Sequence, residues 1–271
     1  GSTNNLTNIG ISGNTGHYLV ESDQTGSWNF TDVVISDNIL ETTVIFMDEG
    51  SESSGSVFER VQITGHDYPA LYRSSFIEEQ MIFNNCTFAD NNLLGSGYPS
   101  AIMAISTIGS ISITNSIFYS PLHNEWGEVV IQNGVDGEIH YSDIHGGLDA
   151  VVSPYGVSEI TAYENNIDAD PLFADPENGD FTLMQSSPCI DAGTSYIEIE
   201  GEPFEDINGN DIWDGGEEFI DINQNGLYDT SFTIEIPEDD YCGIAPDMGA
   251  FEYITEDCGE LSVAPEIPLS Y

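Results

Sequence analysis

A spaced pattern of apolar residues recurs over the first 167 residues and constrains the fold more than any other feature. It is clearest in residues 83–88, FNNCTF, where apolar or small residues stand five and two positions before a large apolar residue. Counterparts of that last residue follow one another at intervals of 24, 28, 25, 30, 26 and 23 positions. They are Ile11, Ile35, Ile63, Phe88, Phe118, Ile144 and Ile167. Such a period is typical of a solenoid, in which each repeat buries its apolar face by stacking on its neighbours.

Two further columns accompany this reference column. Five positions earlier stand Leu6, Phe30, Phe58, Phe83, Ile113, Ile139 and Ala162, and two positions earlier stand Ile9, Val33, Val61, Cys86, Ser116, Ser142 and Asn165. Residues two apart on a strand face the same side, so the reference column and the one next to it predict one inward face. The three-residue gap predicts a bend, which pairs such as Thr31-Asp32 and Asn84-Asn85 favour. We therefore predict an all-β parallel β-helix of about seven to eight coils over residues 1–200; a regular antiparallel sandwich would not produce three registered columns.

The charge balance excludes several classes of partner. The 271 residues include 48 acidic side chains, two basic ones and a formal net charge of -46. Nucleic acid is not expected as a partner, because binding it requires basic residues that replace counterions. No membrane insertion is expected either, since no apolar run approaches the roughly 18 residues that cross a bilayer. Self-repulsion of this size calls for screening by salt or by divalent cations, and adaptation to saline or calcium-rich water is the simplest explanation.

The four cysteines are compatible with an oxidising exterior. Cys86 falls in the inward column, so we expect a buried thiol. Cys242 and Cys258 flank one short strand-like segment and are the preferred disulfide pair, with Cys189 as the remaining cysteine. Spacing alone leaves the connectivity open.

Two segments near the end of the chain carry a family resemblance. Residues 166–193 read NIDADPLFADPENGDFTLMQSSPCIDAG and residues 246–253 read PDMGAFEY. They resemble the closing module of secreted bacterial right-handed parallel β-helix proteins, of the choice-of-anchor Q kind. The resemblance implies a right-handed solenoid, an extracellular or cell-surface location, and closing strands over residues 233–258. Residues 259–271 form a Pro-rich tail that is expected to be a linker.

Residues 201–232 interrupt this module with an internal repeat of period 15. Phe204 and Trp213 recur as Phe219 and Tyr228. The first copy has the spacing of an EF-hand loop, with oxygen ligands at positions 1, 3, 5, 9 and 12 and a backbone carbonyl at position 7. These ligands are Asp206, Asn208, Asn210, Asp214 and Glu217, with the carbonyl of Ile212. Asp211 stands where the pattern expects glycine.

The second copy is shorter. Its ligands are Asp221, Asn223, Asn225 and Asp229, with the carbonyl of Leu227. Phe232 replaces the bidentate glutamate, so the loop resembles those of dockerins and thrombospondin type 3 repeats, and a ligand must come from elsewhere, with Glu217 or Glu218 as candidates. We predict calcium as a structural cofactor that contributes folding energy; the alternative is an acidic surface loop without metal.

These features predict an extracellular calcium-binding β-helix with a structural, adhesive or glycan-binding role at the cell surface. No capping helix precedes the first coil, whose unpaired backbone groups would invite another chain. Either the chain was cut from something longer, or copies associate end to end into a filament, since such a contact does not close.

A carbohydrate-active enzyme is the alternative, either a calcium-dependent polysaccharide lyase or a glycoside hydrolase. The resemblance to β-helix lyases implies acidic residues that hold calcium against a uronate and a basic residue that abstracts a proton. Arg60 and Arg73 are the only arginines and lysine is absent. Arg60 falls in a bend between Asp32 and Asn85 and is expected to pair with Asp32. An outward groove with clustered carboxylates beside either arginine would favour the lyase.

Overall fold

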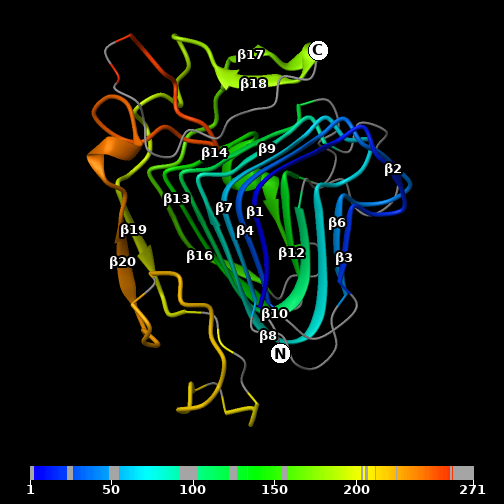
Figure 1. Ribbon diagram of the computed structural model, residues 1–271, viewed down its shortest axis with the longest axis vertical. Coiled ribbons are helices and arrows are strands. Elements are labelled where there is room, and N and C mark those ends of the chain that lie inside the picture. Colours follow the sequence, from blue (N-terminus) through cyan, green and yellow to red (C-terminus); the bar gives the residue numbers. More distant parts are fainter. Residues whose placement is uncertain are drawn as a thin grey trace.

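The computed structural model shows an all-β protein whose parallel strands stack into a β-solenoid, as the spacing of apolar residues predicts (Figure 1). It describes residues 3–22, 27–48, 55–91, 103–121, 127–132, 134–153, 158–202, 204, 207–210, 212–223, 225–256 and 258. Helix in this part of the chain is confined to the 3₁₀ turns η1 (Gly147–Ala150), η2 (Pro176–Asn178) and η3 (Glu238–Asp240). No helix in the described ranges has the length and apolar character to cross a membrane.

Three parallel ladders form the sides of the coil. The first joins β1 (Thr3–Ser12), β4 (Ser27–Ser36), β7 (Ser56–Thr64), β8 (Leu71–Asn84), β10 (Met103–Thr114), β13 (Val135–His140) and β16 (Glu159–Glu164). The second joins the end of β7 to β9 (Thr87–Ala89), β11 (Ile117–Tyr119) and β14 (Asp143–Ile144). The third joins β3 (Val20–Ser22), β6 (Ile45–Asp48), the starts of β8 and β10, β12 (Val129–Gln132) and β15 (Val151–Val152). The short strands β2 (Thr15–Gly16) and β5 (Ile39–Leu40) pair beside them.

The apolar columns of the sequence form the core of the stack. Leu6 pairs with Phe30, and this column continues through Phe58 and Phe83. Phe58 lies between the other two rings with centroid separations of 4.6 and 4.7 Å, and the rings are nearly parallel. Stacking of this kind adds about 0.5–1.5 kcal/mol per pair beyond the burial of area. The ring column therefore fixes the register between coils as well as filling the interior.

A single residue with left-handed backbone makes each bend between the first and second ladders. These residues are Asn8, Asp32, Arg60, Asn85, Asn115, Tyr141 and Asn165, with φ between 48° and 58°. Asparagine and aspartate tolerate this conformation because their short side chains bond locally. Arg60 and Tyr141 have no such advantage, so their neighbours must hold them there.

The last coil departs from the predicted columns by one residue. Gly137 pairs with Ile160 but Glu138 pairs with Ala162, so Thr161 is an extra residue in a bulge. Ile139 consequently pairs with Tyr163, and not with Ala162 as the columns predict. A Cβ on Gly137 would lie 2.7 Å from Ile160 Cδ1, so the missing side chain makes room for Ile160.

The same shift changes the end of the other two columns. Ile167 bridges Asp143, one residue before its predicted partner Ile144. Ser142 receives its cross-coil contact from Asn166, whose Oδ1 accepts from the Ser142 amide at 2.9 Å, where the columns placed Asn165. A spacing that varies between coils cannot reveal a bulge, because a bulge only adds one residue to a length that already changes.

The segment after the solenoid lies against its outer surface. It contains two antiparallel pairs, β17 (Phe173–Asp175) with β18 (Asp180–Leu183) and β19 (Tyr196–Ile199) with β20 (Phe232–Glu235). Cys189 and Met248 pack with Phe181 against Ala89 and Ile117. Figure 1 shows β17 and β18 over one end of the coil cross-section and β19 and β20 along its side.

Two glycines permit this close approach. A Cβ on Gly193 would lie 2.8 Å from Asn115 Oδ1 and 2.7 Å from the Pro246 carbonyl. A Cβ on Gly249 would lie 2.8 Å from Thr87 Oγ1. The amide of Gly249 donates to the Asn115 carbonyl at 2.7 Å. Both glycines belong to the IDAG and PDMGAFEY segments, whose sequence is thus suited to docking on the solenoid.

Three acidic side chains of the same segments bind backbone amides. Asp191 accepts from Ile244 at 2.7 Å, and Asp247 accepts from Asp191 at 2.8 Å. Glu252 accepts from Asp247 at 3.0 Å, and burial raises its pKa to about 8. A disulfide joins Cys242 to Cys258 beside this network. Cys86 and Cys189 are free, buried thiols, as the inward column predicts for Cys86.

Candidate functional site

The 15-residue repeat of the insertion forms two loops that face each other. Phe204 and Phe219, equivalent in the repeat, form an antiparallel bridge. Trp213 stacks on its counterpart Tyr228 with centroids 4.9 Å apart and an interplanar angle of 14°. Each loop is therefore held by aromatic residues from both copies, and the pair forms one unit.

In the first loop, three predicted ligands converge on one point. The amide nitrogens of Asn208 and Asn210 lie 2.7 and 3.1 Å from the same oxygen, Asp214 Oδ2. Glu217 closes the loop, since its two carboxylate oxygens accept from the amides of Ile207 at 3.0 Å and Asp214 at 2.8 Å. Ile212 is 65% exposed, so a contribution from this residue would come from its backbone. Asp206 and Asp211 lie outside the described residues.

The second loop repeats this arrangement. The amide nitrogens of Asn223 and Asn225 lie 2.8 and 2.6 Å from Asp229 Oδ2. Asp221 accepts from the amides of Asn225 at 3.0 Å and of Gly226 at 2.7 Å. Leu227, like Ile212, has an exposed side chain.

Glu202 occupies in the second loop the place that Glu217 takes in the first. Its oxygens accept from the amides of Ile222 at 2.8 Å and Asp229 at 3.0 Å, and it is 1% exposed. The sequence suggested Glu217 or Glu218 for this position. Glu217 is instead committed to the first loop. The period of the repeat could have identified Glu202 from the sequence, because Glu202 stands 15 residues before Glu217.

The donor set suits a hard cation. An asparagine amide presents nitrogen or oxygen depending on a half-turn of its terminal torsion, so the same side chains can direct three oxygens at the point where they now meet. Glutamate oxygens retain further lone pairs after accepting one amide each. Among the described residues, no three His, Cys, Asp or Glu side chains form a metal-binding group. A cation in either loop would therefore need oxygens from the asparagines and from backbone carbonyls in addition to carboxylates.

The loop pair is anchored to the solenoid. Ile220, between the two loops, packs with Ile197 and Ile199 of β19 against Val57 and Ile82. Val57 and Ile82 belong to β7 and β8, so this small core lies on the outside of the coil. Ordering of the loops is thereby coupled to docking of β19 and β20.

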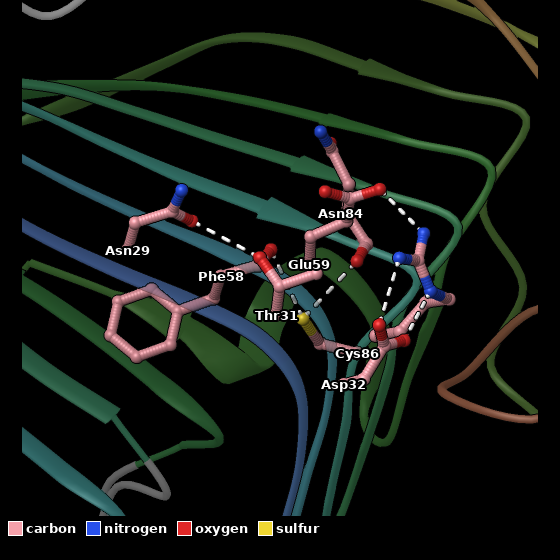
Figure 2. Close-up of polar contacts among 8 residues, drawn as sticks. Asn29, Thr31, Asp32, Phe58, Glu59, Asn84 and Cys86 are labelled. Carbon is pink, nitrogen blue, oxygen red and sulfur yellow. Dashed lines mark hydrogen bonds and ion pairs between the residues drawn. The ribbon is translucent and has the colours of Figure 1, made fainter. Parts of the chain in front are cut away.

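Arg60 lies at a second location, where the coil bends. Its Nε donates to Asp32 Oδ1 at 2.6 Å and its Nη1 donates to Glu59 Oε1 at 2.5 Å (Figure 2). Burial lowers the pKa of Arg60, but the hydrogen bond to Asp32 and the charges of Glu59 and Asp32 outweigh it and hold the pKa above its usual value. The predicted pairing with Asp32 is present, and Arg60 is unsuited to act as a base. The side chain of Arg73 is not described.

A pocket lies beside this ion pair, between the solenoid and the segment that crosses it. Its volume is about 280 Å³. Glu59, Arg60 and Asn84 line it from the solenoid, and Ile234, Phe251 and Ile254 line it from the other side. Nothing in the linear sequence brings these residues together, because the two sets stand between 150 and 195 positions apart.

Asn84 is the buried polar residue of this pocket. Phe83 faces the core, so the alternation of a strand turns Asn84 outward, where the crossing segment leaves it 3% exposed. Its Oδ1 is fully buried and has no hydrogen-bond partner among the described residues. Such an orphaned acceptor costs about 1–3 kcal/mol unless a donor reaches it.

Comparison with known proteins gives no assignment: no family model, curated protein or solved structure matches this chain.

Proposed function

We propose that this chain is an extracellular, calcium-stabilised β-solenoid with a structural or adhesive role at a cell surface. The observation that carries the proposal is the repeated geometry of the two loops, in which two asparagines and an aspartate converge and one glutamate closes each loop. Calcium takes six to eight oxygens at 2.3–2.6 Å, which side-chain and carbonyl oxygens of such loops supply. Calcium would order the loops and offset part of the net charge of -46.

Two further features support the location. The Cys242–Cys258 disulfide is typical of proteins from oxidising compartments. The IDAG and PDMGAFEY segments serve here to dock the chain end on the solenoid, which fits membership of the secreted bacterial β-helix group that they resemble.

Thermal unfolding tests the calcium proposal. We expect calcium to raise the unfolding midpoint, EDTA to reverse the rise, and Asp206→Ala to remove most of it. Glu198→Gln is the matched control, because Glu198 is exposed on β19 and belongs to neither loop. An unchanged midpoint in calcium would refute a structural metal site.

Self-association end to end remains part of the proposal. In the described part of the chain, β1 pairs on one side only, with β4, and Ile9 on that strand is 41% exposed. Light scattering over a concentration series, with and without calcium, tests for polymers; a constant monomer mass would contradict them.

The enzymatic alternative has one observation in its favour. Glu59, Glu235, Asp240 and Glu252 do gather beside Arg60, which is the arrangement that a lyase would need. The pairing of Arg60 with Asp32 and Glu59 argues against its use as a base. Release of unsaturated products from uronate polymers, measured by absorbance, tests this alternative, and a glycan that binds without turnover would favour the adhesive role.

A further inference from the structure

The pocket between the solenoid and residues 232–254, which cross it, has an apolar wall that the described residues leave partly open. Ile234, Ile236 and Phe251 line this wall and are only half-buried. Ile254, at its edge, is 52% exposed. Apolar side chains that gather in one hollow of about 280 Å³ favour an occupant that removes them from water.

The hollow is a built feature of the fold, because hydrogen bonds hold the crossing residues against the coil. The amide of Gly249 donates to the Asn115 carbonyl at 2.7 Å, and the amide of Ala250 donates to Thr87 Oγ1 at 2.9 Å. Both contacts immediately precede Phe251, so the position of the apolar wall is fixed relative to the solenoid.

The rim of the pocket disfavours an acidic occupant. Glu59, Glu235 and Asp240 line it, and Arg60 is already paired with Asp32 and with Glu59. A second copy of this chain would have to bring its own net charge of -46 up to this rim. The pocket therefore favours an uncharged apolar occupant that is held nearby.

The C-terminal segment, residues 259–271, begins beside the pocket and lies outside the described residues. The disulfide holds Cys258 to Cys242 with their Cα atoms 5.6 Å apart, and the Cys242 amide donates at 3.3 Å to Glu252, which lines the pocket. Ile254 stands four residues before Cys258, so at most about 14 Å separates them. The chain from Cys258 to residue 267 spans up to about 30 Å, which is enough to return to the pocket.

The sequence of this segment suits the apolar wall. Residues 261–271 read LSVAPEIPLSY, and Glu266 is their only charged side chain. A residue before proline favours extended backbone, and side chains two apart on an extended chain face the same side, so the two side chains that flank Pro268 face one way. Proline also lowers the entropy lost when a segment becomes ordered. A tether this short gives an effective concentration on the order of millimolar, so a small contact suffices.

We infer that residues 267–269 dock in this pocket of the same chain, with Ile267 and Leu269 packed against the wall that Ile236 and Ile254 form. The docked residues cover the open apolar wall and close the pocket to other ligands. The tail is then a linker only up to residue 266. This inference goes beyond the calcium proposal and does not depend on it.

Methyl NMR of the full chain tests the docking directly. We expect nuclear Overhauser contacts from the Leu269 methyl groups to Ile236 and Ile254. Ile254→Asp places a charge on the wall and should remove the contact between Leu269 and Ile236. Ile244→Asp places the same charge on an isoleucine that is 88% exposed and does not line the pocket, so it should keep that contact. Absence of the contacts in the parent, or their loss in both variants, would overturn the inference.

A competition experiment tests the same contact from the side of the tail. Leu269→Asp in the full chain should free the pocket, so a labelled peptide of residues 263–271 should bind this variant at least about tenfold more tightly than the parent, measured by fluorescence anisotropy. Ser262→Asp, the matched control, should bind the peptide as weakly as the parent does. Equal binding by the parent and Leu269→Asp would show that the tail does not occupy the pocket.

Mixed isotope labelling distinguishes docking within one chain from exchange between copies. In a mixture of labelled and unlabelled chains, contacts of Leu269 should arise only within the labelled chains and should not change with concentration. Contacts that join a labelled to an unlabelled chain would assign the occupant to a second copy and overturn the inference.

Discussion

Glu202 and Glu217, 15 residues apart, make the same pair of backbone contacts on two different loops. Glu217 accepts from the amides of Ile207 and Asp214, and Glu202 accepts from those of Ile222 and Asp229. The second loop is thus completed by a residue that precedes the first. The first loop is closed within one continuous segment of twelve residues, whereas the second takes its closing glutamate from outside its own segment.

On the proposal that each loop binds one calcium ion, these contacts predict which ion each glutamate serves. In Glu202→Gln we expect the calcium stoichiometry, measured by titration calorimetry, to fall from two to one, because a neutral amide is a poorer ligand than a bidentate carboxylate. Glu217→Gln should lose the other ion, and the double variant should lose both. Glu198→Gln should keep both. Two ions bound by Glu202→Gln with unchanged affinity would contradict this assignment.

The contact between Asn115 and Thr194 should stabilise the docking of the C-terminal segment on the solenoid. It has φ of 51°, is fully buried, and bonds both the amide and the carbonyl of Thr194. Asn115→Ala should lower the free energy of unfolding by about 2–4 kcal/mol, from backbone strain and two lost hydrogen bonds.

Asn8 provides the matched control for Asn115. It has φ of 53° in the same kind of bend but is exposed. Asn8→Ala should cost only the backbone term, about 1 kcal/mol. Equal losses in urea unfolding of the two variants would show that the contact with Thr194 adds nothing.

The buried carboxyl group of Glu128 should make the fold less stable as pH rises. It is 1% exposed, and burial raises its pKa to about 8. The folded carboxyl keeps a proton that the unfolded chain releases near pH 4.5, so the stability from this group is full below about pH 4.5 and is lost as pH rises from there through about 8. Glu128→Gln should therefore be more stable than the parent at pH 9 and similar to it at pH 4.5. Glu164→Gln, at an exposed position, should show no such difference in denaturant unfolding.

The buried imidazole of His66 should make the fold less stable at acid pH. Asn38 Oδ1 accepts from the Asn14 amide, so Asn38 turns Nδ2 toward His66 Nε2 at 3.2 Å. An amide nitrogen cannot accept a hydrogen bond, so Nε2 must be the acceptor of this contact. His66 Nδ1 then carries the proton and donates to Asn91 Oδ1 at 3.0 Å. Burial lowers the pKa of His66, so the imidazole stays neutral in the fold.

The stability tied to neutral His66 is present above about pH 6.5 and falls as pH drops through the lowered pKa, because the unfolded chain binds the proton first. Nitrogen chemical shifts of the imidazole should show the Nδ1–H tautomer at pH 7 and no titration near pH 6.5. His66→Gln should flatten the acid limb of the unfolding curve, while His17→Gln, at an exposed position, should not. Titration of His66 near pH 6.5 would contradict the buried chain of hydrogen bonds through Asn38, His66 and Asn91.

The sequence by itself determined the features that arise from stacking equivalent positions. A parallel coil places each column residue on its counterpart, so Phe30, Phe58 and Phe83 must stack, Cys86 must face inward, and Arg60 must meet Asp32 one coil away. Polar residues at the bends follow for the same reason, since one conformation recurs at each corner. The period of 15 likewise identified both loops and their asparagines.

Only the tertiary structure decided the features that depend on contacts without a sequence period. The bulge at Thr161 depends on space beside Gly137, and the pocket around Asn84 exists because a segment from β20 to Ile254 crosses a distant bend. Asn115 meets Thr194 for the same reason. Packing between non-equivalent residues that are far apart in the sequence leaves no repeated spacing from which it could be predicted. Its geometry depends on how one folded unit fits the surface of another.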